Sequence, residues 1–256
     1  MSRAYRTNPI TTLVLGAAVA FIAALMALPA SAQDATGSAQ QPASTTSANP
    51  CGEGLFELKP GSGLCTHGHD PAPAGVDPSD EVEPVKPSAV AARGFVAAGP
   101  NYTCDGDGVS GPRFQLGYVV SADDPDRYDQ YEESIKFWGQ TVSDMMNASA
   151  RKTGGERRIR FVHDASCAPT VIKAILPARS TDDPLDTIFG FFHTPHYDKT
   201  LGRNFALFVD GTGSGPSCGL ATSSRDDQPG FENAANRGNL LALVYSGCWS
   251  ADMMAH

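Results

Sequence analysis

Residues 113–145, RFQLGYVVSADDPDRYDQYEESIKFWGQTVSDM, join a strand pattern to a helix pattern. Residues 113–120 alternate apolar and polar side chains and then become apolar, which predicts a β-strand. Asp123-Asp124-Pro125 follows, and capping aspartates with a proline often begin a helix. The next apolar side chains are spaced three and four residues apart, as on one face of a helix: Tyr128, Tyr131, Ile135, Trp138, Val142 and Met145. We therefore expect a strand and then a long amphipathic helix, which ends at Gly154-Gly155.

After this helix, short apolar runs alternate with polar connections. The runs predict further strands at residues 159–162, 171–176, 205–209 and 240–245, and the last two are continuously apolar, as in strands buried on both faces. A short helix is predicted from Leu185 to Phe192, residues 210–239 form a Gly-rich polar excursion, and Ser250 can cap a final helix. This order predicts an α+β fold. It has a mixed twisted sheet of about five strands, one long amphipathic helix and the start of a second.

The N-terminus has the parts of a cleavable export signal. Arg3 and Arg6 precede an apolar run from Ile10 to Leu28, and Pro29 is followed by the small-residue site Ala30-Ser31-Ala32. An uncleaved membrane anchor is the alternative, because a run of this length can just span a bilayer. The proline and the small residues favour cleavage after Ala32. We therefore expect a secreted, extracellular protein with no membrane association once residues 1–32 are removed.

The cysteines agree with export. All of them follow the expected cleavage point: Cys51, Cys65, Cys104, Cys167, Cys218 and Cys248. An even number in an exported chain indicates disulfides, here three. Only Cys51–Cys65 can be predicted, as the local pair, and the other pairings stay open. No Cys-x-x-Cys motif occurs, which argues against a thiolate zinc site.

The charge disfavours polyanionic partners. The chain has a formal net charge of −9, and its signal carries two arginines and no acid, so the charge after cleavage is −9 − 2 = −11. Such a charge argues against nucleic acid and anionic membranes as partners. No pattern indicates an oligomeric state.

Composition divides the mature chain in two. Residues 33–93 are predicted to be a disordered, Pro-rich leader, because they hold few large apolar side chains and prolines recur from residue 71 to residue 87. Within it, residues 51–65 suit a small disulfide loop. Residues 94–256 are long enough to form one domain with its own core.

The end of the chain carries the feature most relevant to function. Cys248-Trp-Ser-Ala-Asp-Met-Met-Ala-His256 follows the last predicted strand and opens a helix. The element order over residues 94–256 resembles the N-terminal part of metzincin zinc endopeptidases, in which a mixed five-stranded sheet packs on a first long helix. The Asp/Gly-rich run 104–111 is similar to secreted actinobacterial proteins of this type, as is the sequence around Cys65-Thr-His67.

The resemblance implies that His256 is the first zinc-binding histidine of a His-Glu-x-x-His helix. The general-base glutamate and the other histidine ligands would follow residue 256, so no catalytic residue is assigned. Zinc is expected only with the complete motif, because a catalytic site needs three protein ligands. The complete enzyme would hydrolyse a peptide or protein substrate. The chain is expected to be truncated at the start of that helix and inactive.

Two other functions remain open. The chain can be an exported, disulfide-stabilised binding module without catalysis. A serine hydrolase is the third reading, since residues 215–219 match G-x-S-x-G around Ser217 and are followed by Asp226 or Asp227 and then His256. Its serine should stand on a turn between a strand and a helix, which this sequence does not predict.

Three other patterns are ambiguous. Asp105 and Asp107 stand in a Gly-rich turn that could bind calcium, although its spacing is not that of an EF-hand. His67 with His69, and His193 with His196, are interpreted as exposed histidines. Two glycan acceptor patterns occur, at Asn101 and Asn147.

Overall fold

The structure is a computed structural model. It describes residues 49–58, 60–85, 102–180, 184–192, 202–211, 216–224, 226, 228, 233–238 and 240–256. These residues belong to one compact unit, Ser47–His256, and the expected signal peptide lies outside them. Within the described part of the chain, no helix is both long and apolar enough to span a membrane.

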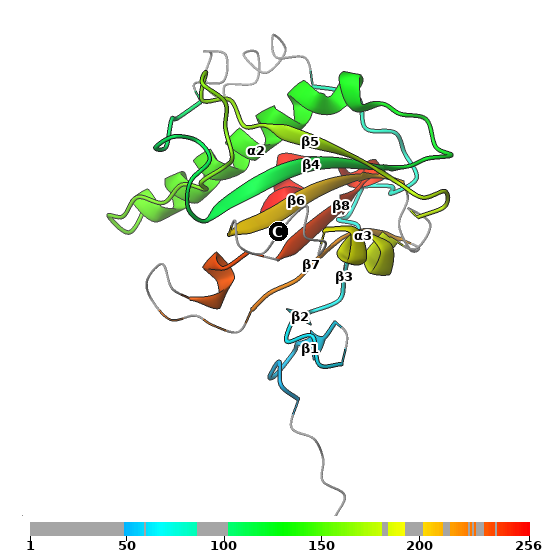
Figure 1. Ribbon diagram of the computed structural model, residues 1–256, viewed down its shortest axis with the longest axis horizontal. Helices are drawn as coiled ribbons and strands as arrows, with labels where there is room; N and C mark the ends of the chain where they lie inside the picture. The colour runs from blue at the N-terminus through cyan, green and yellow to red at the C-terminus, as the bar shows by residue number, and fades with distance from the viewer. Residues whose placement is uncertain are drawn as a thin grey trace, which may run out of the picture. The chain divides into compact units, whose positions relative to one another are not determined.

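A six-stranded mixed sheet forms the centre of the fold, with the strand order β3-β7-β8-β6-β4-β5 (Figure 1). Its strands are β3 (His69–Pro71), β4 (Arg113–Ser121), β5 (Val171–Leu176), β6 (Arg203–Asp210), β7 (Ser217–Ala221) and β8 (Leu241–Tyr245). Strands β5, β4, β6 and β8 are mutually parallel, whereas β7 is antiparallel to β8 and β3 is antiparallel to β7. This sheet, with one long helix, confirms the α+β class.

Helices cover both faces of the sheet. Helix α2 (Tyr128–Arg151) and the short α4 (Ala251–Ala255) pack against one face, where alternate residues of β4 point toward them. Helix α3 (Pro184–Phe192) packs against the other face. Because the sheet is buried on both sides, β4, β6 and β8 have nearly continuous apolar sequences.

The predicted apolar face of α2 is largely confirmed. Tyr131, Ile135, Trp138 and Val142 are all buried, and the Trp138 ring stacks on Phe208 of β6 with centroids 5.4 Å apart. At the ends of this face, Tyr128 is half-buried and Met145 is 39% exposed. The helix therefore contacts the sheet through its middle turns.

The helix begins later than its predicted signal. Asp123-Asp124-Pro125 lies before the helix, whose first residue is Tyr128 and whose N-cap, Arg127, makes no side-chain cap. Instead the Arg127 amide donates to the hydroxyl of Tyr118 on β4, at 2.8 Å. The Tyr128 amide donates to the Asp126 carboxylate at 3.1 Å. The predicted helix start at Asp123-Asp124-Pro125 was therefore wrong by a few residues.

Two strand predictions also differ from the structure. Residues 159–162 were predicted as a strand but pair with the sheet only through the bridge Phe114–Phe161, because the chain turns away at Asp164, whose carboxylate accepts from the Ser166 amide. Conversely, β7 lies inside the region expected to be a polar excursion. Its pairing with β8 is accompanied by the Cys218–Cys248 disulfide.

Residues 49–85, here called the docked segment, join the fold. Strands β1 (Phe56–Glu57) and β2 (Cys65–Thr66) form a small antiparallel sheet beside the predicted Cys51–Cys65 disulfide, which is confirmed. Strand β3 then extends the main sheet. Composition assigned these residues to a leader, yet their backbone groups pair with the domain. The remaining elements are two 3-10 turns, η4 (Ala234–Asn236) and η5 (Ser246–Cys248).

Candidate functional site

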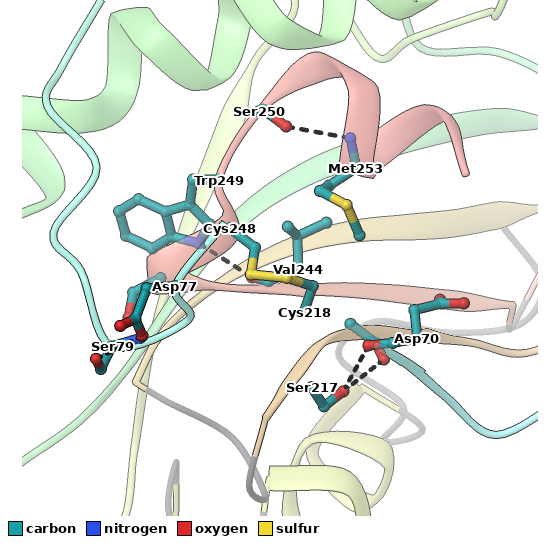
Figure 2. Close-up of a disulfide and its surroundings, with 12 residues drawn as sticks. Asp70, Asp77, Ser79, Ser217, Cys218, Val244, Cys248, Trp249, Ser250 and Met253 are labelled. Atoms are coloured by element: carbon teal, nitrogen blue, oxygen red, sulfur yellow. Dashed lines mark hydrogen bonds between the residues drawn. A yellow bond between two sulfur atoms is a disulfide. The ribbon is translucent and has the colours of Figure 1, made fainter. Parts of the chain in front are cut away.

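The start of helix α4 is held firmly on the sheet. The Cys218–Cys248 disulfide ties it to β7, and the buried Trp249 indole donates to the Val244 carbonyl at 3.0 Å. Ser250 caps the helix as predicted, because its hydroxyl accepts from the Met253 amide at 3.1 Å (Figure 2). The helix that leads to His256 is therefore anchored by a covalent bond, a buried aromatic ring and a cap.

His256 stands at the C-cap of α4, beside the docked segment. Its Nδ1 lies 3.4 Å from Oδ1 of Asp70 on β3, and its side chain is 66% exposed. Nδ1 of His67 lies 3.7 Å from the same Asp70 oxygen, and that carboxylate is only 12% exposed. The predicted metal position thus faces a carboxylate placed between two imidazoles, an arrangement that no pattern in the sequence predicted.

This donor set does not match a catalytic zinc site. Such a site needs three protein ligands around one ion. No group of three or more His, Cys, Asp or Glu side chains suited to a metal occurs among the described residues. His256 therefore stays a predicted ligand, and no hydrolytic step is derived through zinc.

Ser217 does not stand on a nucleophile elbow. It is the first residue of β7, its side chain is buried, and the chain continues as a strand to Ala221. Its Oγ lies 3.2 Å from Nδ1 of His69 and within hydrogen-bond distance of two carbonyls, at 3.2 Å from Asp70 and 3.0 Å from Gly219. The predicted partner His256 contacts Asp70 instead, so the geometry gives the serine hydrolase reading no support.

The Asp/Gly turn at residues 105–110 is satisfied by protein groups. The Asp107 carboxylate accepts from the amides of Val109 and Ser110 and from the Ser110 hydroxyl. Asp105 is bonded to Arg160, and this hydrogen bond holds the pKa of Asp105 below its ordinary value. These carboxylates stabilise the turn, which the Cys104–Cys167 disulfide also closes.

The remaining sequence candidates divide into two groups. Asn147 is buried in α2, where its Oδ1 accepts from the Arg157 amide at 3.3 Å, so it serves the fold. His67 and His69 are exposed, as expected, but take part in the docked segment. Asn101, His193 and His196 lie outside the described residues.

A buried ionic cluster joins three parts of the fold, and no sequence pattern predicted it. Asp210, at the end of β6, accepts from Arg127 at 2.5 and 3.0 Å and from the Tyr118 hydroxyl at 2.5 Å. Arg127 also pairs with Glu81 of the docked segment and lies over the Trp249 ring, 5.8 Å from its centroid. The Asp210 carboxylate raises the pKa of Arg127, whose charge therefore persists at every physiological pH.

No protein family, no curated protein and no solved structure matches this chain. The fold and the site define it as an α+β domain with three disulfides, in which a segment preceding the domain supplies an edge strand.

Proposed function

We propose that this chain is a secreted metallopeptidase-like protein of the metzincin type, with His256 as its first zinc-binding histidine. The observation that carries the proposal is the path of the chain into α4. A mixed sheet packs on the long helix α2, and its strand β8 leads through η5 directly into the anchored helix that presents His256. The metzincin resemblance implies this arrangement.

Export is part of the proposal. The three disulfides are compatible with a secreted protein, because such bonds persist in oxidising compartments. The apolar N-terminal run with its Ala-Ser-Ala site supplies the export route.

The expected substrate is an extended peptide or protein segment. An edge strand of the sheet can align such a substrate by strand addition, in which main-chain hydrogen bonds supply affinity. The resemblance assigns the general base to the same helix as His256.

Zinc titration of residues 33–256 by calorimetry tests the role of His256. We expect weak zinc binding that His256→Ala reduces further. The control His69→Ala should leave zinc binding unchanged, because the His69 ring lies beside the Ser217 hydroxyl, with Nδ1 3.2 Å from Oγ. We also expect no chelator-sensitive proteolysis. Zinc binding that is unchanged by His256→Ala, or robust proteolysis, would contradict the assignment of His256 as a zinc ligand.

A non-catalytic binding module is the second candidate. It is favoured by one observation, the antiparallel pairing of the extended strand β3 with β7 at the edge of the sheet. It predicts that zinc has no effect on peptide binding. The serine hydrolase reading predicts that a fluorophosphonate labels Ser217, and the burial of that hydroxyl leads us to expect no labelling.

A further inference from the structure

We propose that residues 65–72 are an intramolecular occupant of a peptide-binding edge, and that β7 accepts an extended peptide when this segment leaves. The identity of the ligand as a peptide rests on the proposed function. The occupancy itself rests on the hydrogen bonds, charges and covalent connections that join the docked segment to the domain.

The contacts between the segment and β7 are largely of the main-chain kind. At one end Cys65 and Ser223 form two hydrogen bonds. The Cys65 amide donates to the Ser223 carbonyl at 3.0 Å, and the Ser223 amide donates to the Cys65 carbonyl at 2.7 Å. At the other end the Ala72 amide donates to the Pro216 carbonyl at 3.3 Å, with the antiparallel pairing of β3 and β7 between them. Such bonds do not depend on side-chain identity, so a different extended peptide can form them.

Side chains bury the ends of residues 65–72, where Cys65 and Thr66 are buried and Ala72 packs against the core, and the middle is held by polar contacts. Strand β3 is short, its register shifts between Asp70 and Pro71, and two of its three residues are exposed. Asp70 is its most buried residue, and its carboxylate faces His256 of the domain. In Figure 2, Asp70 and Ser217 lie side by side on the two strands, joined by a hydrogen bond. A peptide with a carboxylate at the Asp70 position would therefore fit best.

No disulfide holds the segment to the domain. Cys51–Cys65 lies wholly within the docked segment, whereas Cys104–Cys167 and Cys218–Cys248 lie wholly within residues 102–256. Every cysteine is used by these bridges. Residues 49–72 are thus joined to the domain only by the chain that follows them. Val82 and Val85 pack against the core beside α2, and the Val85 amide donates to the Ser134 hydroxyl at 2.9 Å. Residues 65–72 can therefore open locally while the later part of the docked segment and the domain stay folded.

The position of the edge connects it with the proposed site. The main sheet has β3 at one end of its strand order and β5 at the other. The β3 end contacts His256, through Asp70. A peptide that replaced β3 would therefore pass beside the histidine that we assign to zinc, which is where a substrate is required.

Amide hydrogen exchange measured by NMR on residues 33–256 tests whether the segment opens alone. Two neighbouring amides form a matched pair. The Ser223 amide donates to the Cys65 carbonyl of the segment at 2.7 Å, and the Thr222 amide donates to the carbonyl of Leu241, the first residue of β8, at 2.8 Å. After correction for intrinsic rates, we expect Ser223 to exchange roughly tenfold faster or more, because local opening exposes it without global unfolding.

Asp70→Ala should accelerate exchange at Ser223 a further two- to fivefold and leave exchange at Thr222 unchanged. This factor corresponds to the stabilisation expected from a partly exposed ion contact. Asp144→Ala, which removes an exposed ion pair with Arg158, is the control and should change neither amide. Equal exchange at Ser223 and Thr222, governed by global unfolding, would show that the segment is an integral part of the fold and would overturn the proposal.

A second measurement tests whether the edge accepts a peptide. A synthetic peptide of residues 65–72 with Cys65→Ser is added to the ¹⁵N-labelled Asp70→Ala protein. We expect saturable shifts at residues 217–223, and weaker binding of a peptide that also carries Asp70→Ala. Unmoved resonances at saturating peptide would refute the peptide edge. Neither measurement involves zinc, so success here beside a failed zinc titration would leave a peptide-binding module.

Discussion

Asp210→Asn tests the buried ionic cluster that joins β6, helix α2 and the docked segment. The substitution keeps the size of the side chain and removes its charge. Arg127 then loses a charged partner that it contacts at 2.5 and 3.0 Å, and Tyr118 keeps only a neutral acceptor. The change therefore isolates the electrostatic part of the cluster.

The structure sets the expected size of the effect. Removing one partner of a fully buried ion pair costs about 3–5 kcal/mol. The Asp210 side chain is only 7% exposed, but that of Arg127 is 22% exposed and Arg127 retains Glu81 as a second carboxylate. We therefore expect a loss of about 2–3 kcal/mol in the free energy of unfolding, below the fully buried range.

Urea denaturation of residues 33–256 at pH 7 measures this loss. Asp144→Asn is the matched control, because its ion pair with Arg158 has a 59% exposed carboxylate and should be worth about 0–1 kcal/mol. Tyr118→Phe should cost about 2 kcal/mol or more, because it removes one hydrogen bond to a carboxylate and one from a backbone amide. A loss below about 0.5 kcal/mol for Asp210→Asn, with an unchanged denaturant slope, would refute the reasoning.

Two further predictions concern the docked segment and the turn at residue 105. Gly247→Ala should destabilise the docked segment, because a Cβ at Gly247 would lie 1.9 Å from the Pro78 carbonyl oxygen. Gly190→Ala is the control, since a Cβ at this exposed position of α3 meets nothing within 4 Å, and it should stabilise the helix by up to about 1 kcal/mol. Thermal unfolding and amide exchange at Ser223 measure both variants, and equal effects would contradict the contact. The pKa of Asp105 is lowered by its hydrogen bond to Arg160, so its stabilisation is present above the ordinary value of 3.8 and is lost as pH falls below it. The difference in urea midpoint between wild type and Asp105→Asn should therefore shrink from pH 7 to pH 2, and a constant difference would argue against this linkage.

The sequence predicted the elements whose patterns are set by burial. The three- and four-residue spacing identified α2, and the apolar runs identified β6 and β8, because a helix packed on one side and strands covered on both sides impose those patterns. The wrong predictions concern elements whose structure depends on contacts with residues distant in sequence. Strand β7 has the sequence SCGLA, which has little strand character, and it pairs with β8 alongside a disulfide whose partner the sequence could not identify.

The site was predicted less completely than the fold. His256 was identified as a candidate zinc ligand from the element order and the family resemblance. Asp70 lies in a proline-rich segment whose composition indicated an extended linker, and no local pattern shows that such a linker pairs with β7. Main-chain pairing of this kind leaves little trace in composition, because the bonds use groups that almost every residue has.

The coding sequence beyond the His256 codon provides the most direct test of the central claim, that α4 opens a zinc-binding His-Glu-x-x-His helix. The measurement is the reading frame of the natural gene, obtained by sequencing across this position. We expect a glutamate codon directly after His256 and a histidine codon three positions further on. A stop codon immediately after His256 would contradict the metallopeptidase-like assignment and leave the peptide-binding module.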